Sequence, residues 1–247
     1  MNRVRIDGVR AVDVPDRIEE FLRGGASHVV HFCPAHPTVL ARDDPGYRAI
    51  LNRGDLNLPD GASVVWAIGL LGGRVERVTG TDTFLRLCRA GEPRRWRHYL
   101  YGGAPAVVQQ LRLRLEDEFP GILIVGAESP PFRPLDDGDL ELAAERIRRS
   151  GADLVWVGLG TPKQDVVAEQ LRARDAAPVF LCVGAAFDFL SGQKQRAPLW
   201  MQQAGLEWAH RLAQEPGRLW HRYLIGNIRF VAGVLADRAG SIARSRR

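Results

Sequence analysis

The feature that most constrains the fold is a repeated order of apolar run, glycine turn and amphipathic helix in the second part of the chain. The run His98–Tyr101 leads into Gly102 and Gly103, and the helical pattern Pro105–Glu118 follows. The same order recurs at Asp153–Val157 with Gly158 and at Pro178–Val183 with Gly184. Strands separated by helices pair in parallel rather than as hairpins. The sequence therefore predicts an α/β fold with a Rossmann-like, mostly parallel sheet flanked by helices.

The first part of the chain also carries strand and helix patterns. Arg3–Val14 predicts a strand and a turn, Pro15–Arg23 a helix, and Ser27–Cys33 a buried strand. Asp82 is expected to cap a helix over Thr83–Cys88, because a carboxylate accepts the unpaired N–H groups of a first turn.

One carboxylate stands apart from these patterns. Asp60 lies between a proline and a glycine, directly before the helical run Ala62–Leu71. Such a carboxylate either caps the helix or projects into a cleft as a general base. Arg77 has no capping role, and it is placed to pair with Asp60 or with a phosphate.

The three glycine turns indicate where a ligand binds. Ligands of parallel sheets bind beyond the carboxyl ends of the strands, where Gly102, Gly158 and Gly184 are expected. Backbone N–H groups at such turns hold a diphosphate without a metal ion. None of the turns has the spacing of a known dinucleotide or P-loop motif, so the sequence predicts nucleotide binding only in general terms.

Two clusters of residues are possible metal sites. His31, Cys33 and His36 lack a fourth ligand at a usual spacing. The acidic run Asp136–Asp139 fits the positive end of the helix Leu140–Arg149 equally well. We therefore predict no metal and no other cofactor. The three cysteines are expected to be buried thiols of a reducing compartment, which favours the cytoplasm.

The C-terminal part carries the positive charge. Between Gln193 and Arg247 there are ten Lys and Arg and three Asp and Glu, a net charge of +7, against −2 for the first 192 residues. A basic tail suits phosphate-rich partners. The longest uncharged apolar stretch, Ala62–Gly73, is too short to span a bilayer, so any membrane contact is expected to be peripheral.

Two helices are predicted in this tail, Leu199–Gln214 and Arg218–Asp237. The second carries an apolar stripe at helical spacing, opposite an arginine face. The stripe consists of Trp220, Leu224, Ile228, Val231 and Leu235. The helix either docks on the protein through this stripe or lies with its aromatic residues at a membrane surface.

Several motifs together resemble the WecG/TagA/CpsF glycosyltransferase family. They are Pro59-Asp60-Gly61, Arg77-x-x-Gly80-x-Asp82, Gly102-Gly103, Gly158-Leu159-Gly160-x-Pro162-Lys163-Gln164, Gly184-Ala185-Ala186-Phe187-Asp188-Phe189, Arg196-Ala197-Pro198-x-Trp200-Met201, Gly205-Leu206-Glu207-Trp208 and Gln214-Glu215-Pro216. They occur in order over nearly the whole chain. The resemblance implies an inverting, metal-independent enzyme that moves a sugar, such as N-acetylmannosamine, from a UDP-sugar to a polyprenyl-diphosphate-linked sugar in cell-surface polysaccharide synthesis. It places the protein at the inner face of the cell membrane.

The resemblance also implies roles for individual residues. Asp60 is the general base and Arg77 steadies a phosphate. Residues expected to bind the substrates are Gly102, Gly103, Gly158, Gly160, Gln164, Gly184, Asp188, Arg211, Arg218 and Arg222. Residues 1–195 would form the core, with the base and the acceptor site in 1–95 and the nucleotide-sugar site in 96–195, and 196–247 a membrane-proximal appendage.

One departure from the family pattern concerns the acceptor. Many members have Thr-x-Asn where this chain has Phe32-Cys33-Pro34, so a hydroxyl and an amide are lost. We infer a changed sugar or acceptor, and either His31 or His36 is a candidate for the lost polar contact.

Two other classes of function stay open. A non-catalytic regulator or scaffold would bind the UDP-sugar without turnover. Nucleic-acid binding is disfavoured, because the tail aromatics lie at helical positions and the rest of the chain is slightly acidic. A homo-oligomer is compatible with the sequence.

Overall fold

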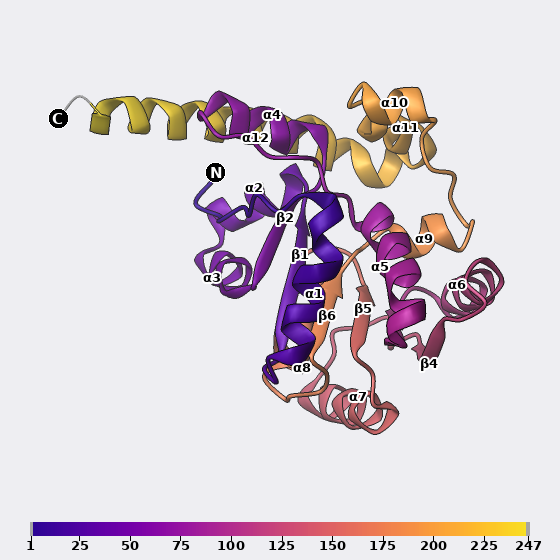
Figure 1. Ribbon diagram of the computed structural model, residues 1–247. Coiled ribbons are helices and arrows are strands. Elements are labelled where there is room, and N and C mark those ends of the chain that lie inside the picture. The colour runs from indigo at the N-terminus through magenta and orange to yellow at the C-terminus, as the bar shows by residue number, and fades with distance from the viewer. Residues whose placement is uncertain (1, 246–247) are drawn as a thin grey trace.

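The computed structural model describes residues 2–245, apart from the side chains of residues 218, 222 and 240–245. Its centre is one six-stranded sheet in the order β2-β1-β6-β5-β3-β4, and every neighbouring pair is parallel (Figure 1). The strands are β1 (His28–Cys33), β2 (Leu56–Pro59), β3 (Arg97–Gly102), β4 (Leu123–Glu128), β5 (Leu154–Gly158) and β6 (Val179–Cys182). The predicted α/β class and the parallel sheet are confirmed.

Helices cover both faces of the sheet, which is why its central strands are apolar without alternation. One face is covered by α1 (Val14–Arg23), α5 (Gly80–Arg94), α6 (Pro105–Glu118) and the short α9 (Ala186–Leu190). The other is covered by α3 (Pro45–Arg53), α7 (Asp137–Ser150) and α8 (Lys163–Arg172). In the first layer Phe84 stacks on Trp156 with ring centroids 3.8 Å apart, and Phe187 meets Phe84 edge-on. These aromatic contacts fix the helices against the sheet.

Two predictions for the N-terminal part are wrong. Residues 3–10 form no strand, although Asp7 exchanges hydrogen bonds with Asn57 of β2, and a short 3-10 helix follows at Ala11–Asp13. The α5 helix starts at Gly80, and its cap is Thr79, whose hydroxyl oxygen accepts the N–H of Asp82. The Asp82 carboxylate is thereby left to pair with other groups.

The C-terminal part differs from the prediction at one break. Instead of one helix over Leu199–Gln214 there are two, α10 (Leu199–Gln203) and α11 (Glu207–Gln214), separated where Gly205 takes a φ of +73°. The long α12 (Pro216–Ser245) then runs back across α2 (Ala35–Asp43) and α4 (Ala62–Leu70), as Figure 1 shows. Among residues 2–245, no helix has both the length and the apolar character needed to cross a membrane.

The contact between α12 and the protein is made by a face that the sequence did not single out. Leu219, Phe230 and Val234 are buried, and Phe230 and Val234 pack with residues of α2 and α4. The predicted stripe lies beside this face and is exposed, with exposed fractions from 39% for Val231 to 71% for Ile228. The alternative in which the helix docks on the protein is therefore confirmed, but the face that docks is not the predicted stripe. A run of large apolar side chains is left in contact with solvent.

Candidate active site

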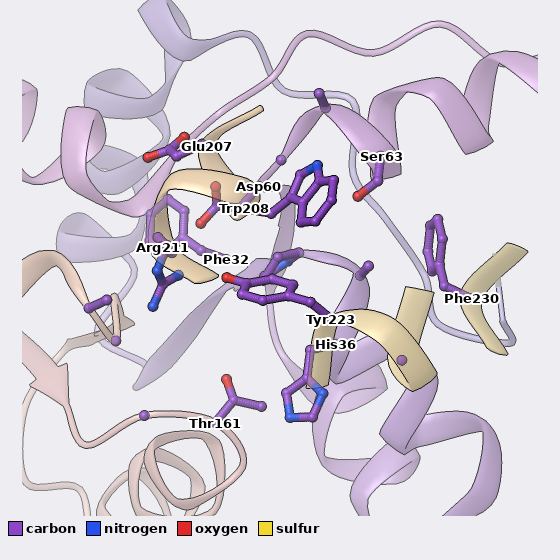
Figure 2. A pocket seen from close by; sticks show the side chains of 18 of the residues that line it. Phe32, His36, Asp60, Ser63, Thr161, Glu207, Trp208, Arg211, Tyr223 and Phe230 are labelled. Atoms are coloured by element: carbon purple, nitrogen blue, oxygen red, sulfur yellow. The ribbon is translucent and has the colours of Figure 1, made fainter. Parts of the chain in front are cut away.

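A cleft of about 660 Å³ lies over the carboxyl ends of β2, β1, β6 and β5. Its walls include residues of α4, α11 and α12, so the C-terminal part of the chain closes it from one side. The volume is that of a typical small-molecule site. Figure 2 shows side chains from both ends of the sequence converging on this cleft.

Asp60 lies in the cleft directly after β2. The turn depends on Gly61, whose φ of +111° is a conformation that residues with a Cβ rarely adopt. The Asp60 carboxylate accepts the N–H of Gly80 at the start of α5. Burial and the nearby Glu207 together raise the pKa of Asp60 to about 6, against the lowering effect of Arg77 and Arg211. A carboxyl with a pKa near neutrality is suited to general-base chemistry.

The glycine turns after β5 and β6 form the opposite wall. Gly158, Gly160, Gln164 and Gly184 all line the cleft. The Gln164 amide donates to the carbonyl oxygen of Cys182 at 3.1 Å, while its Oε1 is buried without a hydrogen-bond partner in the described residues. A buried acceptor without a donor is costly unless a ligand supplies one. This wall therefore offers backbone and amide groups to a bound molecule.

Two charged residues that line the cleft, Asp188 and Arg211, differ in their contacts. Asp188 lines the cleft, and its carboxylate is paired with Lys194 at 2.6 Å. The guanidinium of Arg211 lies 5.6 Å from the centroid of the Phe189 ring and faces the same cleft. Arg211 therefore presents a cation to the cleft from α11.

Gly102 and Gly103 have a structural role at the end of β3. The N–H of Gly103 donates to the carbonyl oxygen of Gly158 at 3.0 Å, and neither glycine is among the residues that line the cleft. Gly102 has a φ of +142°, and a Cβ there would lie 2.6 Å from the backbone of Gly158. These two glycines stabilise the turn at Gly158 by a backbone hydrogen bond and a close backbone contact.

We expect Gly102→Ala to lower the free energy of unfolding by about 1–3 kcal/mol, because the added methyl group overlaps backbone atoms. Urea denaturation measures this. The control is Gly69→Ala within α4, where a Cβ meets nothing within 4 Å. That change should leave stability equal or higher by about 0.5–1 kcal/mol. Equal stability of the Gly102→Ala and wild-type proteins would contradict this account of the turn.

Arg77 contacts the C-terminal part of the chain. Its guanidinium donates to the carbonyl oxygen of Gln202 at 2.7 Å and pairs with Glu207 at 3.1 Å. The residue faces the cleft and acts electrostatically on Asp60. In the sequence its ion-pair partner, Glu207, stood out only as part of a motif.

The two histidine candidates separate. His31 is buried beneath the cleft and hydrogen-bonded through Nδ1 to Asp165 at 2.8 Å. His36 lines the cleft together with Phe32 and Pro34, which stand at the altered acceptor motif (Figure 2). Of the two, only His36 is placed to contact a substrate.

The acidic cluster considered for a metal ion forms a helix cap instead. Asp136 and Asp139 form a capping box at the start of α7, and Arg133 pairs with Asp139. These carboxylates are therefore engaged within the protein.

A different group of metal-ligand type lies beneath the cleft. His31, Asp165 and Cys182 have ligand-type atoms within 4.8 Å of one another in the described part of the chain. The Asp165 carboxylate already accepts hydrogen bonds from His31 and Tyr47, and burial raises the pKa of the Cys182 thiol far above its usual range. The group is a buried polar contact between β1, β6 and α8.

Arg218 and Arg222 belong to α12, but their side chains lie outside the described residues. Other residues of the tail reach the cleft, although no role was predicted for them from the sequence. Glu207, Trp208 and Tyr223 line the same cleft as Asp60 (Figure 2). The motif Gly205-Leu206-Glu207-Trp208 was the signal that pointed to Glu207 and Trp208, and Tyr223 lies outside it.

The site combines the edge of a parallel sheet with a carboxyl of raised pKa, a glycine-lined wall and a facing arginine, and comparison with known proteins identifies its class. The sequence profile described as "Glycosyl transferase WecG/TagA/CpsF family" matches residues 1–244. The chain belongs to this family and is a glycosyltransferase.

Two relatives illustrate the similarity. The N-acetylglucosaminyldiphosphoundecaprenol N-acetyl-beta-D-mannosaminyltransferase of Bacillus spizizenii is 34% identical over 185 residues, which cover 74% of this chain and 70% of that protein. The protein of the same name from Bacillus subtilis strain 168 is 34% identical over 182 residues, covering 73% of this chain and 69% of that protein.

Proposed function

We propose that this protein transfers a sugar, N-acetylmannosamine or a related hexose, from a UDP-sugar to a polyprenyl-diphosphate-linked sugar, with inversion and without a metal ion. The observation that carries the proposal is Asp60, a carboxyl with its pKa raised to about 6 at the edge of a cleft walled by glycine turns. The names of the two relatives, which describe transfer to N-acetylglucosaminyldiphosphoundecaprenol, support the choice of acceptor.

The chemistry follows from the positions of the groups. Asp60 takes the proton from an acceptor hydroxyl as its oxygen attacks the anomeric carbon, and the bond to UDP breaks in the same displacement. The UDP leaves with the bonding electron pair. Arg211 and the N–H groups of the turns at Gly158 and Gly184 stabilise the diphosphate charge that develops.

The experiment is a UDP-release assay in EDTA, with a panel of UDP-sugars and a short-chain prenyl-diphosphate-GlcNAc. Release that depends on the acceptor supports the proposal. UDP-sugar binding without release from any pair would favour a non-catalytic regulator. Recovery of release only after Mg²⁺ is added would contradict metal independence.

The rate should depend on pH through the base. Asp60 must be ionised to accept a proton, and its pKa is raised to about 6. We expect kcat/KM to rise about tenfold per pH unit below that value and to level off above it. Initial rates between about pH 4.5 and 8.5 measure this. A flat profile across the acidic half of that range would argue against Asp60 as the base.

The exposed stripe of α12 supports a peripheral position at the cytoplasmic face of the membrane. The short α10 also exposes apolar side chains, with Leu199 74% and Trp200 62% exposed. A row of exposed apolar side chains such as the α12 stripe marks an interaction site, and a lipid acceptor brings the protein to a bilayer.

We expect Leu224→Ser and Ile228→Ser each to weaken binding to phosphatidylglycerol vesicles by about tenfold, because each removes a large apolar side chain from the lipid contact. Vesicle sedimentation measures the affinity. The control is Leu113→Ser on α6, an apolar residue that is 60% exposed elsewhere on the protein. The same loss in the control, or none in the α12 variants, would contradict the membrane-facing assignment.

A further inference from the structure

Glu207, at the start of α11, pairs with two arginines. One carboxylate oxygen lies 3.1 Å from the guanidinium of Arg77, and the other lies 3.5 Å from Nε of Arg196. Its side chain is 25% exposed and lines the same cleft as Asp60. The residue is therefore held from two sides within the candidate active site.

The ion pairs extend to the start of α5. Arg196 also binds Asp82 with two nitrogens, and Asp82 accepts the hydroxyl hydrogen of Thr79 at the α5 cap. The chain Asp82–Arg196–Glu207–Arg77 therefore connects the first turn of α5 to the first turn of α11. Partly buried pairs that form a network with Arg hold their geometry better than isolated surface pairs.

Several charged groups act on Asp60 from the elements around it. Glu207 and Arg211 act from α11, Arg77 acts from the loop before α5, and the N–H of Gly80 donates from α5 itself. Cys33 at the end of β1, a buried thiol, is a further titratable neighbour, and the titratable side chains of His36 and Tyr223 line the same cleft. Glu207 and Arg77 have opposite charges and opposite effects on Asp60, and they are each other's ion-pair partners.

We propose that Glu207 is a positioning residue: by pairing with Arg77, it makes the Asp60 carboxylate a better proton acceptor. This inference rests on the proposed function, since it concerns the base of that reaction. Glu207 binds the guanidinium of Arg77, which also acts electrostatically on Asp60. An unpaired Arg77 would stabilise ionised Asp60 and so make it a poorer proton acceptor.

Glu207 also connects this effect to the closure of the cleft. The residue begins α11, which carries Arg211 into the cleft. One helix therefore carries both Glu207, which raises the pKa of Asp60, and Arg211, which faces the cleft. The base and the cation that faces the leaving group are assembled together.

The test measures the Asp60 titration directly in the full chain. Carboxyl ¹³C NMR, with the Asp60 signal assigned by its loss in Asp60→Asn, gives the midpoint without any substrate. In Glu207→Gln we expect the midpoint to fall by about one pH unit. The acidic limb of kcat/KM should move by the same amount, and the plateau rate should fall several-fold.

A double variant separates charge from a change in packing. In Arg77→Gln/Glu207→Gln both opposing charges are gone, so the midpoint should return close to the wild-type value. A midpoint as low as in Glu207→Gln alone would mean that α11 had moved away from Asp60, and it would overturn the proposal. An unchanged midpoint in Glu207→Gln would overturn it as well.

The matched control is Asp43→Asn, which breaks another arginine pair of the tail, Asp43 with Arg229, outside the cleft. It should leave the Asp60 midpoint unchanged. Wild-type protein that titrates as expected but transfers no sugar would contradict the proposed function and not the pairing of Glu207 with Arg77. The proposed function and the role of Glu207 are therefore contradicted by different results.

Discussion

Asp60→Asn is expected to abolish sugar transfer, with kcat reduced about 10²- to 10⁴-fold, because an amide cannot accept the proton of the acceptor hydroxyl. Binding of the UDP-sugar should be unchanged, since its proposed contacts come from the turns after β5 and β6. Single-turnover transfer and isothermal titration with UDP measure the two effects separately. More than a tenth of wild-type kcat in the variant would exclude Asp60 as the base.

The stability of this variant provides the control. The Asp60 pKa is raised in the folded protein from 3.8 to about 6, so the protein loses stability as the pH rises between these values. Asparagine removes that loss, which is complete above the folded-state pKa. The melting temperature of Asp60→Asn at slightly alkaline pH should therefore equal or exceed that of the wild type. A lower melting temperature would mean that the loss of activity reflects a damaged fold.

Asp165→Ala is expected to give the largest loss of stability, about 3–5 kcal/mol. The carboxylate accepts hydrogen bonds from His31 at 2.8 Å and from the Tyr47 hydroxyl at 2.7 Å, and all three side chains are buried. Its removal leaves two buried donors without acceptors. Because a domain has about 5–15 kcal/mol of stability in total, the variant should be close to unfolding at physiological temperature.

Tyr47→Phe is the matched comparison for Asp165→Ala. It removes one hydrogen bond and leaves the His31 contact, so the loss should be about 1 kcal/mol. Urea denaturation of both variants under the same conditions measures the difference. Equal losses in the two, or a loss below about 1 kcal/mol for Asp165→Ala, would show that this buried contact does not stabilise the fold as described.

The sheet and the location of the cleft could be predicted because they depend on local patterns. Apolar runs separated by helices specify parallel strands, and parallel strands place their following turns on one edge. Asp60, Gly158 and Gly184 lie at or just after the ends of three different strands, so sequence order alone brings them to that edge. An isolated carboxylate between proline and glycine drew attention to Asp60 but left a helix cap and a general base open, and only the family resemblance favoured the base.

The parts that could not be predicted depend on contacts between distant segments. Arg77 and Glu207 are 130 positions apart, and no local pattern reveals their pairing. The apolar spacing of α12 was correct as a pattern. The spacing did not show which apolar face of the helix is buried. Leu219, Phe230 and Val234, which are buried, are as apolar as the residues of the exposed stripe. Gly102 was expected at the ligand, but its role is a close backbone approach to Gly158 that only three-dimensional packing reveals.

The most direct test of the central claim is the identity of the product. We would incubate the protein with UDP-N-acetylmannosamine and prenyl-diphosphate-GlcNAc in EDTA, and examine the lipid by mass spectrometry and NMR. We expect one added N-acetylhexosamine, joined with an anomeric configuration opposite to that in the donor. A product with retained configuration, or hydrolysis of the donor without any glycosylated lipid, would contradict single-displacement transfer by Asp60.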